Sequence, residues 1–546
     1  TVYVHLNGMP VEVNQEGHFS ASLIPHFGVN SIEVIASDNV HSQSTRKRFD
    51  VLWAADYLLP EEDRNGLRLD DGIAFRLGQG FFDNGLPPTV LSEQQIITED
   101  LADIIYLLLS YIDLGESIPN PVVDSDVFYL EVGDVDVHEP YVEIDVTDDG
   151  LELFIQISHL QAATAGHIEL SDRTLDLTGH ILASLSIIAQ ITVSKDGPEL
   201  PFDIELANFE LAIESAEAHF ESVEANAIFE LAESALRENL EALLLDTIST
   251  SFVDVLPDFL LDLFSSLEQA MADRSFEIDL GLGQPFALSF DGRIGFLDTH
   301  YREALEGAVE VDMSVDLPAI HIHSRGVPLM MPLVKEPPFF YTSRIQIGLR
   351  LAMVNGMLHT LWNAGLLELD VGDLLPDGVA ALIQDASFSA KLPPLLSPPL
   401  FGEPHDLLLH LGQIEVHLEY AAQTDVFAAN LVVGVDLVVD HGEIGIQIAD
   451  EPRLALWLVE TTGSAPVLNE QNLRQLILAQ LWPELEASLG AGLSFGLPVP
   501  DLGALADYAP ALEALALELR MTRPLAVRDG FILLDTAFEG ILPLAP

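Results

Sequence analysis

The longest regular pattern in the chain is a stripe of apolar residues that recur every four positions between residues 227 and 272. Because residues four apart share one helix face, the stripe predicts a single amphipathic helix, about 70 Å long at the usual helical rise. Its apolar face comprises Leu236, Leu240, Leu244, Ile248, Phe252, Leu256, Leu260 and Phe264. Pro257 lacks an amide hydrogen, so we expect either a bend there or an elongated domain. A membrane span is disfavoured because aspartates between residues 246 and 262 interrupt every window of about 20 apolar residues.

The first 52 residues alternate apolar and polar side chains in short runs, which predicts an all-β module. Asn7 and Gly8 separate the first two runs, and both residues tolerate the positive φ of a two-residue hairpin turn. The expected strands are Val2–Leu6, Val11–Val13, Phe19–Leu23, Ile32–Ala36 and a last stretch up to Val51.

A first helix is predicted ahead of a long series of strands. It begins at Ser92, whose hydroxyl can cap it, and runs to about Tyr111. Its apolar face comprises Ile96, Ile97, Leu101, Ile104, Ile105, Leu108 and Leu109. Between residues 125 and 223 the period changes to two, which predicts strand pairs, and strands return from Ser275 to about Ile322.

The second half repeats this order of elements. A helix over Thr342–Ala364 precedes strands in residues 366–459, and a second helix over Asn469–Leu489 carries an interior proline, as the long helix does. We therefore divide the chain into a β module at residues 1–52, a first unit at 53–323, a proline-rich joint at 324–341 and a second unit at 342–546. The joint is apolar, so we expect it to pack along the body rather than act as a flexible linker.

The amino-acid composition restricts the kinds of molecule that the protein can bind. The chain has 22 basic and 87 acidic residues, a net charge of −65, and is 49% hydrophobic. Nucleic acid and anionic surfaces should repel it. The acidity reflects either a surface adapted to salt, which we favour, or calcium sites, although the calcium loop pattern D-x-[DN]-x-[DN]-G is missing from the sequence. The absence of cysteine excludes disulfides and thiolate chemistry. The sequence starts abruptly at Thr1 without a charged or apolar leader region, so any signal peptide must lie upstream and have been removed.

Candidate catalytic and metal-binding motifs are weak. Residues 492–496 read GLSFG and match G-x-S-x-G, but a helix precedes the motif and Pro498 follows it, the reverse of a nucleophile elbow. His321 and His323 alternate on an expected strand without a third ligand, so we interpret them as packing or surface residues. We expect no enzyme activity, metal or cofactor.

Many strands are aliphatic on both faces, which exceeds what one helix needs to cover a sheet and predicts an elongated apolar cavity. The order of elements resembles the tubular lipid-binding superfamily, specifically the bactericidal/permeability-increasing, lipopolysaccharide-binding and lipid transfer proteins, over residues 64–543. The matching pieces are LAESALRENLEALLLDTISTSFVDVLPDFL, the joint PLVKEPPFF with the following RIQIGLRLAMVNGMLHTLWNAGLLELDV, and LWPELEASLGAGLSFGLPVPDL.

The resemblance implies an α+β fold, an elongated boomerang of two tandem barrels of antiparallel sheet. Each barrel has two long helices and a pocket for acyl chains, and a central sheet joins the barrels. The family's disulfide cannot form here. Since basic residues are few, a neutral or zwitterionic phospholipid is a better ligand than lipopolysaccharide. The segment VHLNGMPVEVNQEGHFSASLIPHFGVNSIEVIASDN resembles the later half of bacterial immunoglobulin-like domains, which implies a spacer or attachment role for a partial module.

We therefore predict an exported lipid-binding or lipid-transfer protein that contacts membranes transiently. The inward helix stripes should line its pockets. In the first half these residues are Ile97, Leu101, Ile104, Leu108, Leu240, Leu244, Ile248 and Phe252, and in the second half Ile345, Leu349, Met353, Met357, Leu476 and Leu485. The alternative is an extracellular structural or adhesion protein whose barrels are filled by their own side chains.

Overall fold

The computed structural model describes most of the chain. The described residues are 2–38, 43–60, 64–92, 95–111, 120–125, 127–228, 253, 255–278, 285–300, 304–321, 323–330, 337–371, 382–399, 403–440, 443–449, 451–483, 486–487, 495–496 and 509–543. Five predicted pocket residues lie outside them, namely Leu240, Leu244, Ile248, Phe252 and Leu485.

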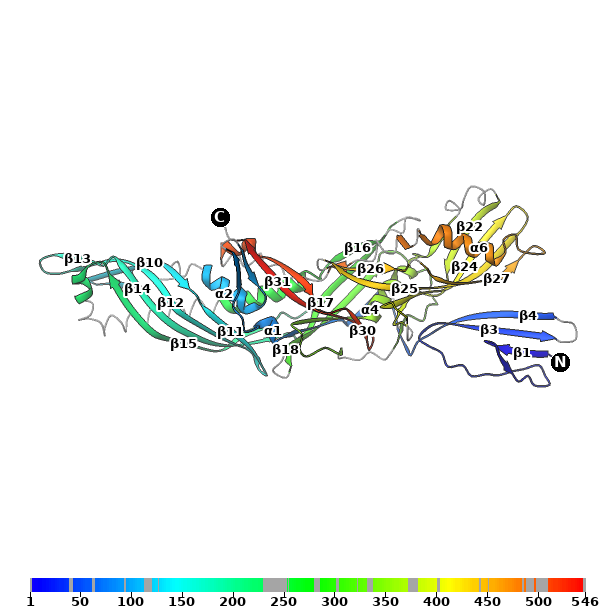
Figure 1. The fold of residues 1–546 in the computed structure, drawn as a ribbon, viewed down its shortest axis with the longest axis horizontal. Helices are drawn as coiled ribbons and strands as arrows, with labels where there is room; N and C mark the ends of the chain where they lie inside the picture. The colour runs from blue at the N-terminus through cyan, green and yellow to red at the C-terminus, as the bar shows by residue number, and fades with distance from the viewer. Residues whose placement is uncertain are drawn as a thin grey trace.

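The molecule is elongated, and three large antiparallel sheets follow one another along its length (Figure 1). The long curled antiparallel sheets of the predicted α+β fold are present, but the described residues are mostly β with few helices, whereas two long helices were expected in each barrel. The sheet at one end has the order β15-β14-β12-β10-β9, with β11 and β13 paired to β12. Its strands are β9 Val123–Asp124, β10 Phe128–His138, β11 Tyr141–Thr147, β12 Gly150–Glu169, β13 Thr174–Asp176, β14 Gly179–Ser194 and β15 Asp203–Phe220. Buried and more exposed residues alternate along β14, so one face of this sheet forms core.

The central sheet combines strands from both halves of the sequence. Its order is β16-β17-β18-β6-β20-β31-β8-β7, with β29 and β30 paired to β31. Its strands are β6 Gly66–Gly78, β7 Thr89–Ser92, β8 Gln95–Thr98, β16 Arg274–Ile278, β17 Phe286–His300, β18 Ala304–Val315, β20 Ile345–Arg350, β29 Ala516–Met521, β30 Ala526–Arg528 and β31 Phe531–Pro543. Strand β6 of the first half therefore lies beside β20 of the second.

The third large sheet lies at the other end of the molecule, beside a small N-terminal sheet of order β2-β1-β3-β4 (Figure 1). The large sheet contains β21 Glu368–Asp370, β22 Ile383–Ala390, β23 Leu395–Ser397, β24 Leu407–Tyr420, β25 Thr424–Asp440, β26 Glu443–Ile448, β27 Arg453–Thr461 and β28 Phe495–Gly496. The small sheet contains β1 Val2–Leu6, β2 Met9–Val11, β3 Gly28–Asp38 and β4 Gln43–Trp53. Strands β5 Asp56–Leu58 and β19 Val327–Leu329 pair with each other.

The Asn7-Gly8 hairpin turn is confirmed. Asn7 and Gly8 have φ values of 47° and 79°, and Leu6 pairs with Met9. The strand predicted over Phe19–Leu23 is wrong, since only a single bridge joins Phe19 to Val13.

The helix predicted from Ser92 begins nine residues later, as α2 Leu101–Tyr111. Residues 95–98, including Ile97, form strand β8, in which Ile97 pairs with Ile541. Asp100 caps the helix in place of Ser92, because the amide of Asp103 donates to its Oδ1 at 2.8 Å.

The helix predicted from Thr342 likewise begins late, as α4 Leu351–Asn363. Ile345 and Leu349 lie in strand β20, which pairs with β6 and β31 at once and whose six residues are all buried. The third prediction is accurate at its start: Asn469 caps α6 Glu470–Leu476 by accepting the amide hydrogen of Asn472. A π-helical turn over Ile477–Leu481 continues α6.

Two described pieces of the long predicted helix are helical: residues 227–228, which end a helical segment that begins at 223, and residues 255–269, which include Pro257. Within it, Leu256, Leu260 and Phe264 of the predicted stripe are buried in the core. Short helical turns form α1 Gln79–Phe82 and a 3₁₀ turn at Pro510–Ala514. The end of the proline-rich joint packs on the central sheet, since Pro337 and Phe339 lie against Gly348.

Candidate functional site: an apolar cavity in the central sheet

A cavity of about 80 Å³ lies between the central sheet and the helical residues 255–269. All thirteen side chains that line it are apolar: Ile73, Phe75, Leu77, Phe81, Leu263, Leu267, Met271, Ile294, Val309, Ile345, Ile347, Leu519 and Phe538. The volume is sufficient for roughly six water-sized groups. An apolar wall of this kind favours methylene groups over water.

Strand register brings these side chains to one face. Leu77 lies opposite Ile345, and Phe75 lies opposite Ile347. Because side chains two apart on a strand point to the same side, these four residues form a continuous apolar surface. The surface extends across β18 and β17 through Val309 and Ile294.

The helix closes the cavity from the other side. Leu263 and Leu267 are four residues apart and therefore lie on one helix face, and Met271 follows in the turn after the helix. This row lies next to the predicted stripe, whose residues Leu260 and Phe264 are buried in the core instead.

Two aromatic rings lie at the C-terminal strand. Phe81 of α1 meets Phe538 of β31 edge to face, with ring centroids 5.6 Å apart. Leu519 is the cross-strand neighbour of Phe538. Such ring pairs add about 0.5–1.5 kcal/mol beyond their area burial, so this wall is well fixed.

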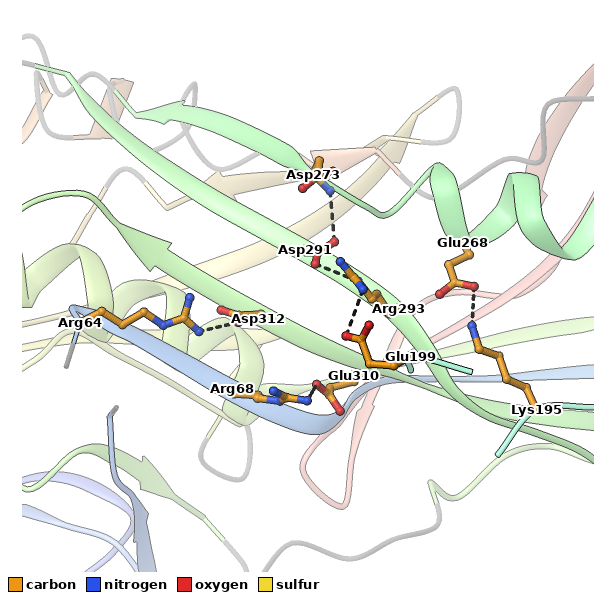
Figure 2. Close-up of polar contacts among 10 residues, drawn as sticks. All are labelled: Arg64, Arg68, Lys195, Glu199, Glu268, Asp273, Asp291, Arg293, Glu310 and Asp312. Atoms are coloured by element: carbon orange, nitrogen blue, oxygen red, sulfur yellow. Dashed lines mark hydrogen bonds and ion pairs between the residues drawn. The ribbon is translucent and has the colours of Figure 1, made fainter. Parts of the chain in front are cut away.

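Figure 2 shows ion pairs between side chains of the central sheet, of the helix over residues 255–269 and of the segment that follows β14. The Lys195 ammonium lies 2.6 Å from the Glu268 carboxylate and 4.4 Å from the ring centroid of Phe202, and its side chain is only 3% exposed. The Lys195 backbone also exchanges hydrogen bonds with Leu297. Lys195 therefore connects the end of β14 both to the central sheet, through Leu297, and to the helix that lines the cavity, through Glu268.

The three arginines drawn in Figure 2 are also paired with carboxylates. Arg293 lies 3.1 Å from both Asp291 and Glu199, and these carboxylates hold its pKa above the ordinary value. Arg64 pairs with Asp312 and Arg68 with Glu310. An anionic headgroup here would compete with a carboxylate at each of these cations.

Two buried carboxylates lie at the start of α2. Burial raises the pKa of Asp100 to about 6, and burial together with Asp100 raises the pKa of Asp103 to about 7. Each accepts backbone hydrogen bonds, Asp100 from Asn84 and Asp103, and Asp103 from Glu99. These bonds to the charged form offset only part of the desolvation cost.

Among the predicted pocket residues, Ile345 lines the cavity. Ile97 lies on β8, and Leu349 and Met353 are buried in β20 and α4. Leu101, Ile104 and Leu108 are buried on α2, while Met357 and Leu476 are partly buried against the core. The lining residues Phe75, Leu267 and Phe538 were not predicted from the sequence, although the alternation of apolar and polar residues at the end of β6 indicates that Phe75 is on the buried face.

The histidine and serine motifs do not converge on a reactive site in the described residues. His321 stacks on Trp362 at 3.8 Å between ring centroids, and His359 accepts or donates a 2.7 Å hydrogen bond with Ser324. Burial lowers the pKa of His359 to about 4. Of the GLSFG motif, the described part is Phe495 and Gly496, which form β28. No group of three histidine, aspartate or glutamate side chains is suited to hold a metal in the described part of the chain.

None of the helices in the described ranges combines the length and the apolar character needed to cross a bilayer.

Comparison with known proteins gives no family assignment. No protein-family model matches the chain, and no curated protein matches it. Among solved structures, it is similar to a lipopolysaccharide binding protein with a TM-score of 0.46 and 14% identity, covering 86% of this chain and 99% of that chain. It is also similar to P47 of Clostridium botulinum E1, with a TM-score of 0.23, 8% identity and coverage of 86% and 99%. For P47 from Clostridium botulinum A2 the TM-score is 0.24, the identity 9% and the coverage 85% and 97%.

Proposed function

We propose that the protein binds an acyl chain of a lipid in the central cavity, without covalent chemistry. The observation that carries this proposal is the lining, which is apolar at all thirteen positions and comes from both halves of the chain and from a helix. A core that only stabilised the fold would be packed to the density of an organic crystal.

The size of the cavity limits how much of a lipid it holds. Roughly six methylene groups fit, and at about 0.8 kcal/mol each they gain about 5 kcal/mol relative to water. Relative to a bilayer the gain is close to zero, because the chain leaves one apolar medium for another. This balance suits a carrier that takes up and releases lipid, and it favours one chain segment over two complete chains.

The charges favour a neutral or zwitterionic headgroup. Lys195 and Arg293 are already paired with carboxylates, and the net charge of −65 opposes the approach of anions. A phospholipid of this type, exchanged during transient membrane contact by an exported protein, is the ligand we propose. We also propose that the N-terminal sheet is a partial immunoglobulin-like module.

A structural or adhesion role is the second candidate. It is favoured by the burial of Leu101, Ile104 and Met353, since these nominated pocket residues lie in the core. In that case the barrels would be filled by their own side chains.

Lipid extraction and native mass spectrometry of the purified protein separate the two candidates. We expect at least one copurified lipid, or saturable uptake of a fluorescent fatty acid or phosphatidylcholine by protein stripped of lipid. Finding neither copurified lipid nor uptake of either probe would leave the structural role.

A further inference from the structure

The N-terminal sheet is fixed to the far end of the second half by a polar contact. Asn430 of β25 donates from Nδ2 to Ser31 Oγ at 2.8 Å and to Asp50 Oδ1 at 2.6 Å, and its Oδ1 accepts the amide hydrogen of Gln413 at 2.8 Å. Asn430 is only 7% exposed. A buried amide with its hydrogen-bonding groups satisfied from both sides specifies one docking geometry.

Close packing supports the same geometry. A Cβ on Gly412 would lie 2.6 Å from Val29 Cγ2, so Val29 fits only because position 412 has no side chain. The guanidinium of Arg48 lies 4.5 Å from the ring centroid of Trp457. The sheet therefore packs directly on β24, β25 and β27 rather than extending away as a spacer.

A second cavity, of about 470 Å³ and open to solvent on one side, lies at this interface. Val29 and Ser31 line it from the N-terminal sheet, and Leu411, Asn430, Leu454 and Arg474 are among the residues that line it from the second half. The volume falls within the range of roughly 300–1,000 Å³ typical of small-molecule sites, which occur preferentially at domain interfaces.

The lining has an apolar part and a charged part. Val29, Leu411 and Leu454 provide apolar walls, while Arg453, Arg474 and Glu451 provide charges. Arg453 is held by Glu403 through two contacts, at 2.7 and 3.3 Å. Arg474 is exposed on α6, and no carboxylate of the described chain lies within ion-pair distance of it. Its guanidinium fork is thus available to a ligand.

We propose that this interface cavity binds an amphipathic small molecule that carries one acidic group, a carboxylate, sulfonate or phosphate. The acid pairs with Arg474, and the apolar body lies between Val29 and Leu454. Glu451 disfavours a second negative charge on the ligand. This site is separate from the acyl cavity, and its existence does not rest on the function proposed for that cavity.

The test uses 8-anilinonaphthalene-1-sulfonate, an apolar ring system with one sulfonate, titrated by isothermal calorimetry into the full chain. A hydrogen bond to a charged group contributes about 1.5–3 kcal/mol, so Arg474→Gln should weaken one binding site about tenfold or more. Arg173→Gln is the matched control, because Arg173 is an exposed arginine in the connection between β12 and β13, at the other end of the molecule. It should leave the affinity unchanged.

Two further variants locate the site. Gly412→Val should displace Val29 and weaken the same site. Leu267→Trp fills the acyl cavity and should leave probe binding at the interface cavity unchanged. A failure of the proposed lipid binding is therefore distinguishable from a failure of this proposal. Equal affinities for Arg474→Gln and Arg173→Gln, or loss of all probe binding in Leu267→Trp, would overturn the proposal. So would a lack of saturable binding to the unmodified chain.

Discussion

Replacing Leu267 by tryptophan is the most direct test of the acyl cavity. Leu267 is partly buried and lines the cavity from the helix, so a larger side chain there can turn into the cavity without disturbing the sheet. Tryptophan carries about six more heavy atoms than leucine, which matches the roughly six water-sized groups that the cavity accommodates. The variant should therefore fill the space that we assign to the acyl chain.

The expected loss of affinity follows from the same count. Excluding about six methylene groups removes about 5 kcal/mol of transfer free energy, which corresponds to about a thousandfold or more in the dissociation constant. Stability should change little. Filling 80 Å³ gains up to about 2 kcal/mol, and strain from an imperfect fit costs about 1–3 kcal/mol.

The assay is saturable uptake of a fluorescent fatty acid, with the melting temperature as a check on folding. Leu382→Trp is the matched control because Leu382 is 61% exposed and lies outside the cavity lining. Unchanged uptake by a folded Leu267→Trp variant would refute the assignment of the cavity. Equal loss in both tryptophan variants would show that the effect is not specific to the site.

Three other predictions concern stability. Burial raises the pKa of Asp103 to about 7, above its unfolded value of about 3.9, so this group lowers stability as pH rises through that window. Asp103→Asn should therefore raise the melting temperature more at pH 8 than at pH 4.5. An equal gain at both pH values would contradict this reasoning. A Cβ on Gly540 would overlap Thr98 Oγ1, so Gly540→Ala should cost about 1–3 kcal/mol, whereas Gly445→Ala, whose nearest neighbour is 3.7 Å away, should change chemical denaturation little. The melting temperature should rise in molar salt, which screens the repulsion of 65 excess negative charges, and a flat or falling value would exclude that effect.

Local sequence patterns were sufficient to predict the structure where a short segment determines its own conformation. The Asn7-Gly8 turn and the Asn469 cap depend on neighbouring residues only, and both were predictable from sequence. The long antiparallel strands were also predictable, because alternation over many residues has no competing helical reading.

The two early helix starts were wrong for a common reason. Residues 95–98 and 345–350 each contain closely spaced aliphatic residues, which fit a helix stripe as well as a strand. Their actual partners are distant: Ile97 pairs with Ile541, and β20 pairs with β6 and β31. Tertiary pairing overrode local propensity, and no local pattern reveals a partner some 270 or 440 residues away in the chain.

The position of the cavity follows from that same distant pairing. Its walls come from β6, β20 and β31, which join only when both halves of the chain are folded against each other. A ligand that binds the assembled cavity but not the separated halves must stabilise their association, by about 2.7 kcal/mol at a hundredfold excess over its dissociation constant. If lipid binds in this cavity as we propose, its binding is coupled to the integrity of the central sheet as a whole. A lipid that occupied a pocket within one half would stabilise that half alone, so thermal unfolding with and without bound lipid distinguishes a cavity at the junction from a pocket within a barrel.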